Sequence, residues 1–380
     1  MKIIMKNNKI TDLRHELHKH PELSHKEFQT VERISDFINA ASPDEVISLG
    51  STGKAFVFNG KEKGKTLMFR AELDALPITE ESILEYSSSN SNVSHSCGHD
   101  GHMAIVAGLA LKIAEMRPKK GRVILLFQPA EEVGEGAREI VNDPAFIAIA
   151  PDYIFALHNI PGAETNHILL KSDTFAAASK GMTVKLIGKT SHAAEPENGI
   201  SPVNAIQHII KNLSDLASDK SKFRDMILLT FIHIRMGEIA FGTSPGYAEI
   251  MITLRAFDND DMDFLTRQSE DIISKIAEDE KLRFEISYSE VFPAVVNQDD
   301  CVNLVVQAAK ENNLPIDKLK TPFKWSEDFS YFTQNHHGCM FGLGAGVNQP
   351  QLHNSDYDFP DELLESGINM FFSIYNKINF

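Results

Sequence analysis

Residues 94–116 read SHSCGHDGHMAIVAGLALKIAEM, a polar start followed by an Ala- and Leu-rich run that is long enough for a buried helix. This run lies between two strand-like segments, KTLMFRAELDAL at 65–76 and GRVILLFQPAEE at 121–132. Two more apolar segments, at 54–60 and 152–160, have the length and composition of strands. Strands that alternate with helices are typical of an α/β layer architecture. We therefore predict an α/β fold with a mixed sheet flanked by helices.

The pattern changes near residue 175. From there the apolar segments read strand, helix, strand, strand, helix, strand, at 181–189, 201–218, 225–237, 247–257, 258–280 and 282–294. This βαββαβ order is the ferredoxin-like unit. Because α/β character returns after it, we predict a small domain at 175–289 inserted into a larger domain made of residues 1–174 and 290–380.

Composition narrows the classes of function. The chain has 380 residues, 42% of them hydrophobic and 24% charged, with a net charge of −16 and three cysteines. An acidic chain without a basic run is a poor candidate for binding nucleic acid or an anionic membrane. No apolar run approaches the ~20 residues of a membrane span, and the amino terminus lacks the apolar stretch of a secretion signal. An odd number of cysteines does not describe a disulfide framework, so we expect a cytoplasmic protein with reduced thiols.

The polar start of the first segment contains a candidate metal-binding pair. Cys97 and His99 are separated by one residue, and a thiolate and an imidazole are both good ligands for zinc-class ions. A lone cysteine is more often a small core residue, and a structural zinc site with four protein ligands would use the same residue types. This segment alone leaves these interpretations open.

Other potential ligands follow apolar segments elsewhere. Glu131 and Glu132 come directly after the strand-like VILLF, which by itself also describes an exposed turn. In a metal site, one of two adjacent glutamates can bind the ion while the other takes a proton from water. His158 and His353 lie after an apolar run and in a loop, and each alone would be an ordinary loop histidine. The clusters together favour a metal site.

Two residues of the inserted domain are further candidates. His192, in SHAAEPENGISP, follows the first strand of that domain and is equally compatible with a simple turn before the next helix. Arg255, in MITLRAFD, ends a strand, where it could form an interior ion pair or a bidentate clamp on a substrate carboxylate.

Seven segments, in order along nearly the whole chain, resemble the aminoacylase and amidohydrolase branch of the M20 metallopeptidases: LRHELHKHPELSHKE, RAELDALP, SCGHDGHMA, QPAEEVGEGA, ALHNIP, SHAAEPENGISP and LHNSDYDFPDELL. That branch includes hippurate hydrolases, N-acetyl-amino-acid deacetylases and hydrolases of indoleacetyl-amino acids. The resemblance implies that Glu131 is the general base and that His192 projects toward the reacting carbonyl. It implies that the inserted domain is a lid or dimerisation domain. It also implies a two-metal centre whose ligands are Cys97, as the bridge, and His99, Glu132, His158 and His353.

The activity implied by this resemblance is the metal-dependent hydrolysis of the amide bond of N-acyl-L-amino acids by a homodimer. The two divalent ions could be Zn, Mn, Co or Ni, which all accept histidine and carboxylate ligands. Alternatives are a dipeptidase or carboxypeptidase acting on small peptides, and a non-catalytic metal-binding scaffold on the same fold. A redox protein using Cys97 is disfavoured because no partner cysteine lies nearby in sequence. Two departures from the family pattern are Glu72, where Asp is usual, and the absence of the family's Asn in residues 237–246.

Overall fold

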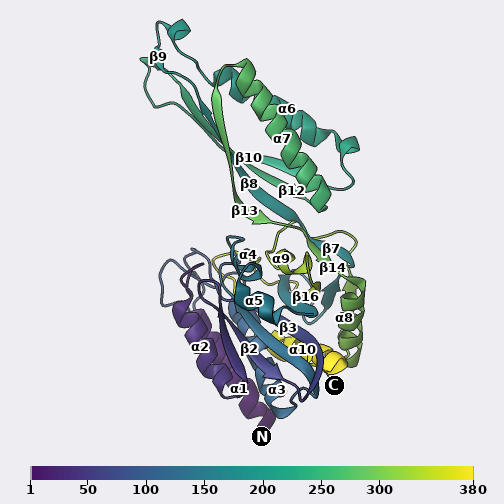
Figure 1. Cartoon of the computed structure of the whole chain (residues 1–380). Helices are drawn as coiled ribbons and strands as arrows, with labels where there is room; N and C mark the ends of the chain where they lie inside the picture. Colours follow the sequence, from purple (N-terminus) through teal and green to yellow (C-terminus); the bar gives the residue numbers. More distant parts are fainter. Residues whose placement is uncertain (1, 380) are drawn as a thin grey trace. The chain divides into compact units, whose positions relative to one another are not determined.

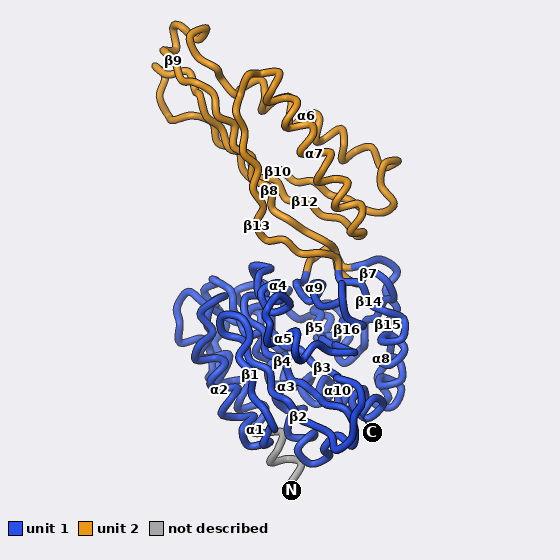
Figure 2. The backbone as a smooth tube through the Cα atoms, viewed as in Figure 1, with its two compact units in different colours: residues 1–175, 295–322, 327–380 blue, residues 176–294, 323–326 orange. Residues whose placement is uncertain are grey.

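The computed structural model describes residues 2–379, with side chains from residue 9 onward. The chain forms two compact units, coloured separately in Figure 2. Unit 1 contains the residues up to Phe175 together with 295–322 and those from Glu327 onward. Unit 2 contains Ala176–Ala294 and the short segment Phe323–Ser326. One unit is thus inserted into the sequence of the other.

Unit 1 is built on an eight-stranded sheet in the order β1-β2-β4-β3-β5-β16-β6-β15. Strands β2, β3 and β16 of this sheet are labelled in Figure 1. Strands β4, β3, β5 and β16 run parallel to one another. Strand β2 pairs antiparallel with both β1 and β4, and β6 pairs antiparallel with β16. The strands are β1 Glu45–Leu49, β2 Gly53–Asn59, β3 Glu62–Glu72, β4 Lys120–Gln128, β5 Tyr153–Pro161, β6 Ile168–Leu170, β15 Ile316–Lys318 and β16 His337–Gly346. The predicted α/β fold with a mixed sheet is confirmed.

Helices cover the sheet of unit 1. α3 and α10 pack on β3, and α1, α2 and α8 pack against one or both of these two helices. The helices are α1 Lys2–Lys19, α2 Phe28–Asn39, α3 His99–Glu115, α4 Gly136–Val141, α5 Pro144–Ile149, α8 Asp299–Glu311, α9 Ser330–Thr333 and α10 Leu363–Asn379. Strand β4 shows why both faces need cover, since its residues from Val123 to Phe127 are all fully buried. Such continuous apolar runs are typical of parallel strands covered on both sides.

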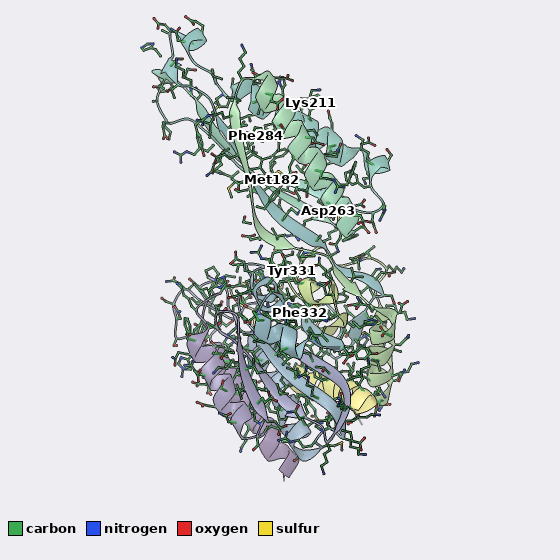
Figure 3. All side chains as sticks on the ribbon, in the orientation of Figure 1. Met182, Lys211, Asp263, Phe284, Tyr331 and Phe332 are labelled. Atoms are coloured by element: carbon green, nitrogen blue, oxygen red, sulfur yellow. The ribbon has the colours of Figure 1, made fainter. Side chains whose placement is uncertain are left out.

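Unit 2 has its own antiparallel sheet in the order β10-β12-β8-β13, which is the strand order of a ferredoxin-like unit. Helices α6 and α7 pack against each other and on this sheet. Met182 and Phe284, labelled in Figure 3, contribute to the apolar core between them. The elements are β8 Ala178–Ile187, β9 Ser191–His192, η1 Pro196–Asn198, α6 Val203–Ser218, η2 Lys220–Lys222, β10 Ile227–Met236, β11 Thr243–Ser244, β12 Tyr247–Ala256, α7 Asn259–Asp279 and β13 Arg283–Phe292.

Two further strands, β7 Asp173–Ala176 and β14 Val295–Asn297, pair with each other where the chain leaves unit 1 and returns to it. Within the part of the chain that the structure describes, no helix is both long and apolar enough to cross a membrane.

Candidate metal centre

The carboxyl ends of the parallel strands β3, β4, β5 and β16 lie at one edge of the unit 1 sheet. The connection from β3 leads through α3 to β4 on one side of β3, and the chain then crosses to β5 on the other side. This is a topological switch point, where open α/β sheets place their binding sites. The polar residues at this edge are Asp74 after β3, Cys97 and His99 at the start of α3, Glu131 and Glu132 after β4, His158 near the end of β5 and His353 after β16.

The five residues expected to be metal ligands meet at this edge. The Cys97 sulfur lies 3.6 Å from Nε2 of His158. One carboxylate oxygen of Glu132 lies 3.9 Å from Nε2 of His99, and the other lies 3.6 Å from Nε2 of His353. Two groups of potential ligand atoms, each within 4.8 Å, contain Cys97: Cys97, His99 and His158, and Cys97, Glu132 and His353. Such a shared sulfur is compatible with a bridging position.

The histidines of these groups are oriented for metal binding. Nδ1 of His99 lies 2.9 Å from the carbonyl oxygen of Asp74, and Nδ1 of His158 lies 2.9 Å from that of Asn159. A carbonyl only accepts, so each Nδ1 carries a proton, and Nε2 is the ring nitrogen left to bind an ion. Gly98 lies so close to Asn159 that a Cβ atom at this position would be 2.7 Å from the side-chain amide nitrogen of Asn159. Glycine therefore allows the start of α3 to approach β5.

Three buried atoms at the site have no hydrogen-bond partner among the described residues: Nε2 of His99, Oε1 of Glu132 and Oδ1 of Asp74. Buried polar atoms are normally paired, and each unpaired atom needs an explanation. Oδ1 of Asp74 lies 3.6 Å from Nδ1 of His99 and so supports that ring. The other two atoms can donate an electron pair to a cation, and together with the thiol they form a set that suits a divalent transition metal. The residues therefore fit a metal ion, although their roles as ligands remain a prediction.

Crowded carboxylates dominate the electrostatics of the site. Burial, reinforced by Glu327 and Glu132, raises the pKa of Glu131 well above its ordinary value. Burial also raises the pKa of Glu132 to about 7, against the lowering effect of His99. The pKa of the Cys97 thiol is raised by burial and then by these same glutamates. Negative charge confined in a buried site favours the binding of cations.

The turn that carries the two glutamates is fixed by buried carboxylates. Ala130 has a left-handed backbone with φ of 50°, which is unusual for a residue with a side chain. Its N–H donates to Glu27 over 2.8 Å, and the N–H of Glu132 donates to Asp74 over 3.0 Å. At Gly136 a Cβ atom would lie 1.6 Å from the carbonyl oxygen of Pro129, so only glycine allows the turn to close this tightly.

A charged network lies beside this turn and was not found by sequence reasoning. Arg70, on β3, is fully buried and its guanidinium donates to Glu72, to Glu327 over 2.9 Å, to Asp328 over 2.6 Å and to Gln128 over 2.8 Å. We call these five residues the Arg70 cluster. Burial would lower the pKa of Arg70, but Glu327, Glu72 and Asp328 outweigh it and raise the pKa. Glu72 also lies 2.7 Å from Nδ1 of His102, so the family departure at this position sits inside the network.

The two candidates of the inserted domain belong to unit 2. His192 lies on β9, paired with Thr243 of β11, and its Nδ1 accepts the N–H of Ala194 over 3.1 Å. Arg255 lies on β12, and its Nη1 donates to the carbonyl oxygen of Lys324 over 2.8 Å and to the Ser326 hydroxyl over 3.1 Å. Arg255 thereby ties the 323–326 segment to the sheet of unit 2. Both assigned roles remain predictions.

Comparison with known proteins places the chain in a family. The model of peptidase family M20/M25/M40 matches residues 68–377. The chain belongs to this family. A hippurate hydrolase of Campylobacter jejuni is 30% identical over 93% of this chain and 92% of its own length. An uncharacterized hydrolase of Staphylococcus aureus is 29% identical over 97% of both chains.

Solved structures agree with this membership of the M20 family. A putative aminohydrolase from methicillin-resistant Staphylococcus aureus superposes with a TM-score of 0.88 at 25% identity, over 98% of this chain and 97% of the other. The YxeP protein of Bacillus subtilis, described as a dinuclear metal-binding peptidase of the M20 family, superposes with a TM-score of 0.83 at 24% identity and covers 97% of both chains. The predicted family and its hydrolytic character are thus confirmed, and this M20 protein is a hydrolytic enzyme.

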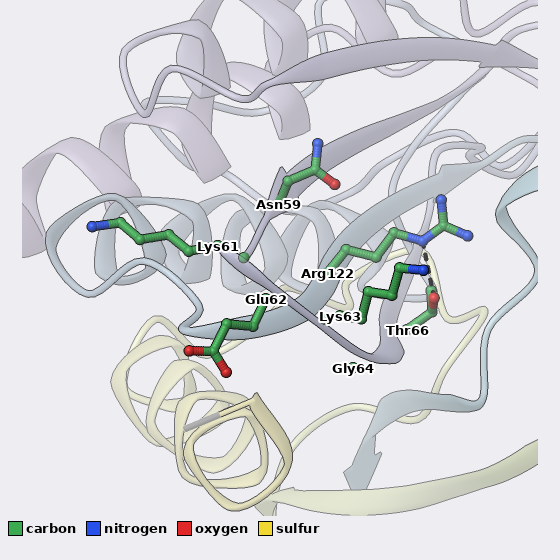
Figure 4. A pocket seen from close by; sticks show the side chains of 9 residues that line it. Asn59, Lys61, Glu62, Lys63, Gly64, Thr66 and Arg122 are labelled. Carbon is green, nitrogen blue, oxygen red and sulfur yellow. Dashed lines mark hydrogen bonds between the residues drawn. The ribbon is translucent and has the colours of Figure 1, made fainter.

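The opposite edge of the same strands has a different character. Where β3 and β4 of this M20 hydrolase begin, a cavity of about 520 Å³ is lined by nine residues from 59–66 and 121–122 (Figure 4). Its charged side chains are Lys61, Glu62, Lys63 and Arg122, and the lining contains neither histidine nor cysteine. The candidate metal ligands lie at the carboxyl edge of these strands, and this pocket at the opposite edge contains none of them.

Proposed function

We propose that this M20 enzyme hydrolyses the amide bond of N-acyl-L-amino acids with two divalent metal ions. One observation carries the proposal. Five potential ligands and a sixth side chain, the Glu131 carboxylate, converge at the carboxyl edge of the parallel strands. The ligands would be Cys97, His99, Glu132, His158 and His353, with Cys97 between the two positions.

Glu131 is suited to move a proton. It lies beside the ligands, with a carboxylate oxygen 4.0 Å from Nε2 of His99, but it is not needed to complete either three-residue ligand group that contains Cys97. Bound divalent ions supply Lewis-acid activation of water and of the scissile carbonyl. Glu131 accepts a proton from the attacking water at its carboxylate and delivers it to the departing nitrogen. Burial raises the pKa of this carboxyl, which makes its carboxylate a stronger base than that of an ordinary glutamate.

His192 is proposed to stabilise the oxygen of the reacting carbonyl. Since Nδ1 accepts the N–H of Ala194, the neutral ring carries its proton on Nε2 and can donate a hydrogen bond from there. A donor aimed at a developing oxyanion is worth about 10²–10³-fold in rate. We propose that His192 acts at the site of a second copy, and that Arg255 contacts the carboxylate of the amino acid.

The substrate class rests on the relatives. The curated relative at 30% identity is a hippurate hydrolase, whose substrate by name is an N-acylated amino acid. This relative is similar along 93% of the chain, so the inserted unit is included in the likeness. We therefore place N-aroyl and N-acetyl amino acids ahead of dipeptides.

The first experiment measures hydrolysis of hippurate, N-acetyl-L-amino acids and dipeptides by protein loaded with Zn, Mn, Co or Ni, with metal content determined in parallel. We expect turnover of N-acyl amino acids that a chelator abolishes and added metal restores. Glu131→Gln should keep both ions and lose about 10²–10⁴-fold in kcat, because it removes a proton carrier and no ligand. Glu132→Ala should instead lose bound metal.

The outcomes separate the alternatives. Turnover of dipeptides alone would favour a dipeptidase, and bound metal without any turnover would favour a scaffold. Near-normal kcat of Glu131→Gln would reject its role as base. The shared site is tested by mixing His192→Ala with Glu131→Gln subunits, since only a site built from two chains regains activity in the heterodimer.

A further inference from the structure

The turn that presents Glu131 has two ends, and one buried side chain holds both. The turn begins after Gln128, the last residue of β4, and ends at Ala137, in the first turn of α4. The carboxylate of Asp328 accepts the Gln128 side-chain amide over 2.8 and 2.9 Å and the N–H of Ala137 over 2.9 Å. Asp328 therefore fixes the distance between the two ends of the turn.

Asp328 also contacts the proposed base directly. Its own backbone N–H donates to Oε1 of Glu131 over 3.3 Å. The guanidinium of Arg70 donates to the Asp328 carboxylate over 2.6 Å. Because this contact fixes the side chain of Asp328, it also restricts where the backbone N–H of Asp328 lies. Asp328 is fully buried, so water does not replace these contacts.

Every hydrogen-bond partner described for the Asp328 carboxylate is a donor: Arg70, Gln128 and the N–H of Ala137. An amide at this position would turn an NH₂ group toward at least one of these donors. The Gln128 amide cannot flip to compensate, because its oxygen accepts Nε of Arg70 over 2.8 Å. The site is thus specific for a carboxylate even though asparagine has nearly the same shape.

We propose that Asp328 is a positioning residue for catalysis, whose carboxylate fixes both ends of the Pro129–Gly136 turn and thereby aims the Glu131 carboxylate at the attacking water. This inference rests on the proposed role of Glu131 as base. Asp328 itself touches no reacting atom, so its contribution passes through Glu131. Misplacing a catalytic group by about 1 Å can cost about 10²-fold in rate.

The test is a double-mutant cycle of Asp328→Asn and Glu131→Gln, with kcat, KM and metal content measured on the metal-loaded enzyme and its best N-acyl amino acid. Asp328→Asn alone should lower kcat about 10–100-fold, with KM and metal content nearly unchanged. In the Glu131→Gln background the same change should alter the residual kcat by less than about threefold, since the group that Asp328 positions is already lost.

Asp261→Asn is the matched control. Asp261 is buried in unit 2, and its carboxylate accepts the N–H groups of Arg224 and Asp225 over 2.9 Å, as Asp328 accepts that of Ala137. Its replacement should leave kcat within about twofold of the parent. Gln128→Met is a second way to disturb the same network, since it removes the amide that accepts Nε of Arg70 and donates to Asp328. It should reproduce the loss of kcat and the non-additivity.

Three results would overturn the proposal: an unchanged kcat in folded Asp328→Asn, an equal loss in the Glu131→Gln background, or a loss that follows metal content. Failure of both Asp328→Asn and Gln128→Met to fold would assign the network to stability alone and would also overturn it. The proposed function fails separately, on inactive wild-type enzyme or on a fully active Glu131→Gln. The cycle is interpreted only where Glu131→Gln has lost turnover, so the two failures are distinguishable.

Discussion

Two buried arginines of unit 1, Arg70 and Arg14, each bind three carboxylates, but only one of the two sets is sealed from solvent. The side chains of Glu72, Glu327 and Asp328 around Arg70 are 0%, 2% and 0% exposed. Around Arg14, Asp100 is buried, whereas Asp358 and Asp361 are 24% and 36% exposed. We call Arg14, these three aspartates and His18, which contacts Asp100, the Arg14 cluster.

The difference shows what buried charge does in each place. In the Arg70 cluster, water does not replace a lost partner, so each charge is held in one position by the others. That rigidity suits a network that touches Glu131. In the Arg14 cluster, solvent can hydrate the two outer aspartates, and the contacts join α1, α3 and the segment before α10. There the arginine ties distant parts of the chain together.

The largest expected effect tests the sealed cluster. Arg70→Met should destabilise the protein by about 3–5 kcal/mol, because removing one partner leaves buried charges uncompensated. Equilibrium urea unfolding of the metal-loaded protein measures this loss. A change below about 1 kcal/mol would mean that water reaches the three carboxylates and that the two clusters do not differ.

The second-largest expected effect is a pH dependence of the unfolding free energy that His18 of the Arg14 cluster contributes. Burial lowers the pKa of His18, but hydrogen bonds to Asp100 and Glu80 outweigh it and raise the pKa from 6.5 to about 9. A raised pKa contributes stability that is fully present below about pH 6.5 and is lost as pH rises through about 9. The loss amounts to roughly 2–4 kcal/mol over this interval.

His18→Asn supplies the reference for this dependence. Unfolding free energies of both proteins, measured at matched metal loading from pH 6 to pH 10, should converge at high pH. Because both proteins carry the same metal site, the effect of pH on metal binding cancels in their difference. Parallel curves across the interval would contradict the assignment of a charged His18.

A smaller loss is expected for Arg14→Met, on the order of 1–3 kcal/mol. Asp358 and Asp361 can then be hydrated, and Asp100 keeps its contact with His18 over 2.9 Å. Urea unfolding beside Arg70→Met gives the comparison directly. A loss as large as that of Arg70→Met would erase the distinction between a sealed and an open cluster.

The smallest effect is expected at the exposed rim. Asp361→Asn should cost less than about 1 kcal/mol, as is usual for ion pairs that reach solvent. Thermal unfolding of this variant should show a small difference from the parent at low salt that shrinks at high salt, because salt screens exposed ion pairs. A larger, salt-insensitive loss would place Asp361 inside the buried part of the cluster.

The fold was predictable from sequence because its central elements have strong local patterns. Strands β3, β4 and β5 each contain a largely apolar buried run, and α3 is apolar on nearly all sides, so composition alone identifies them. The short outer strands β1, β6 and β15 were missed, since three to five residues carry little periodicity. The 323–326 segment of unit 2 was also missed, because its place depends on a contact with Arg255.

The residue types of the candidate site stand out in the sequence, whereas its supporting contacts do not. Metal chemistry admits few side chains, so Cys97 and His99 at the start of the apolar helix and the tandem glutamates after a strand are conspicuous. The Arg70 cluster has no such signal, because its members come from three distant parts of the chain and meet only after folding. An arginine inside the apolar run LMFRA was the one local indication, since a buried guanidinium requires carboxylate partners.

The order of synthesis gives the insertion of unit 2 a consequence for the nascent chain. Strand β5 is made before unit 2, whereas β16, its parallel neighbour, and α10, which packs on β3, are made after it. Unit 2 is nearly contiguous and can fold on the ribosome while β5 still has an open edge. An open strand edge pairs readily with other chains. The yield of soluble protein therefore depends on how quickly translation passes from residue 295 to the end of α10.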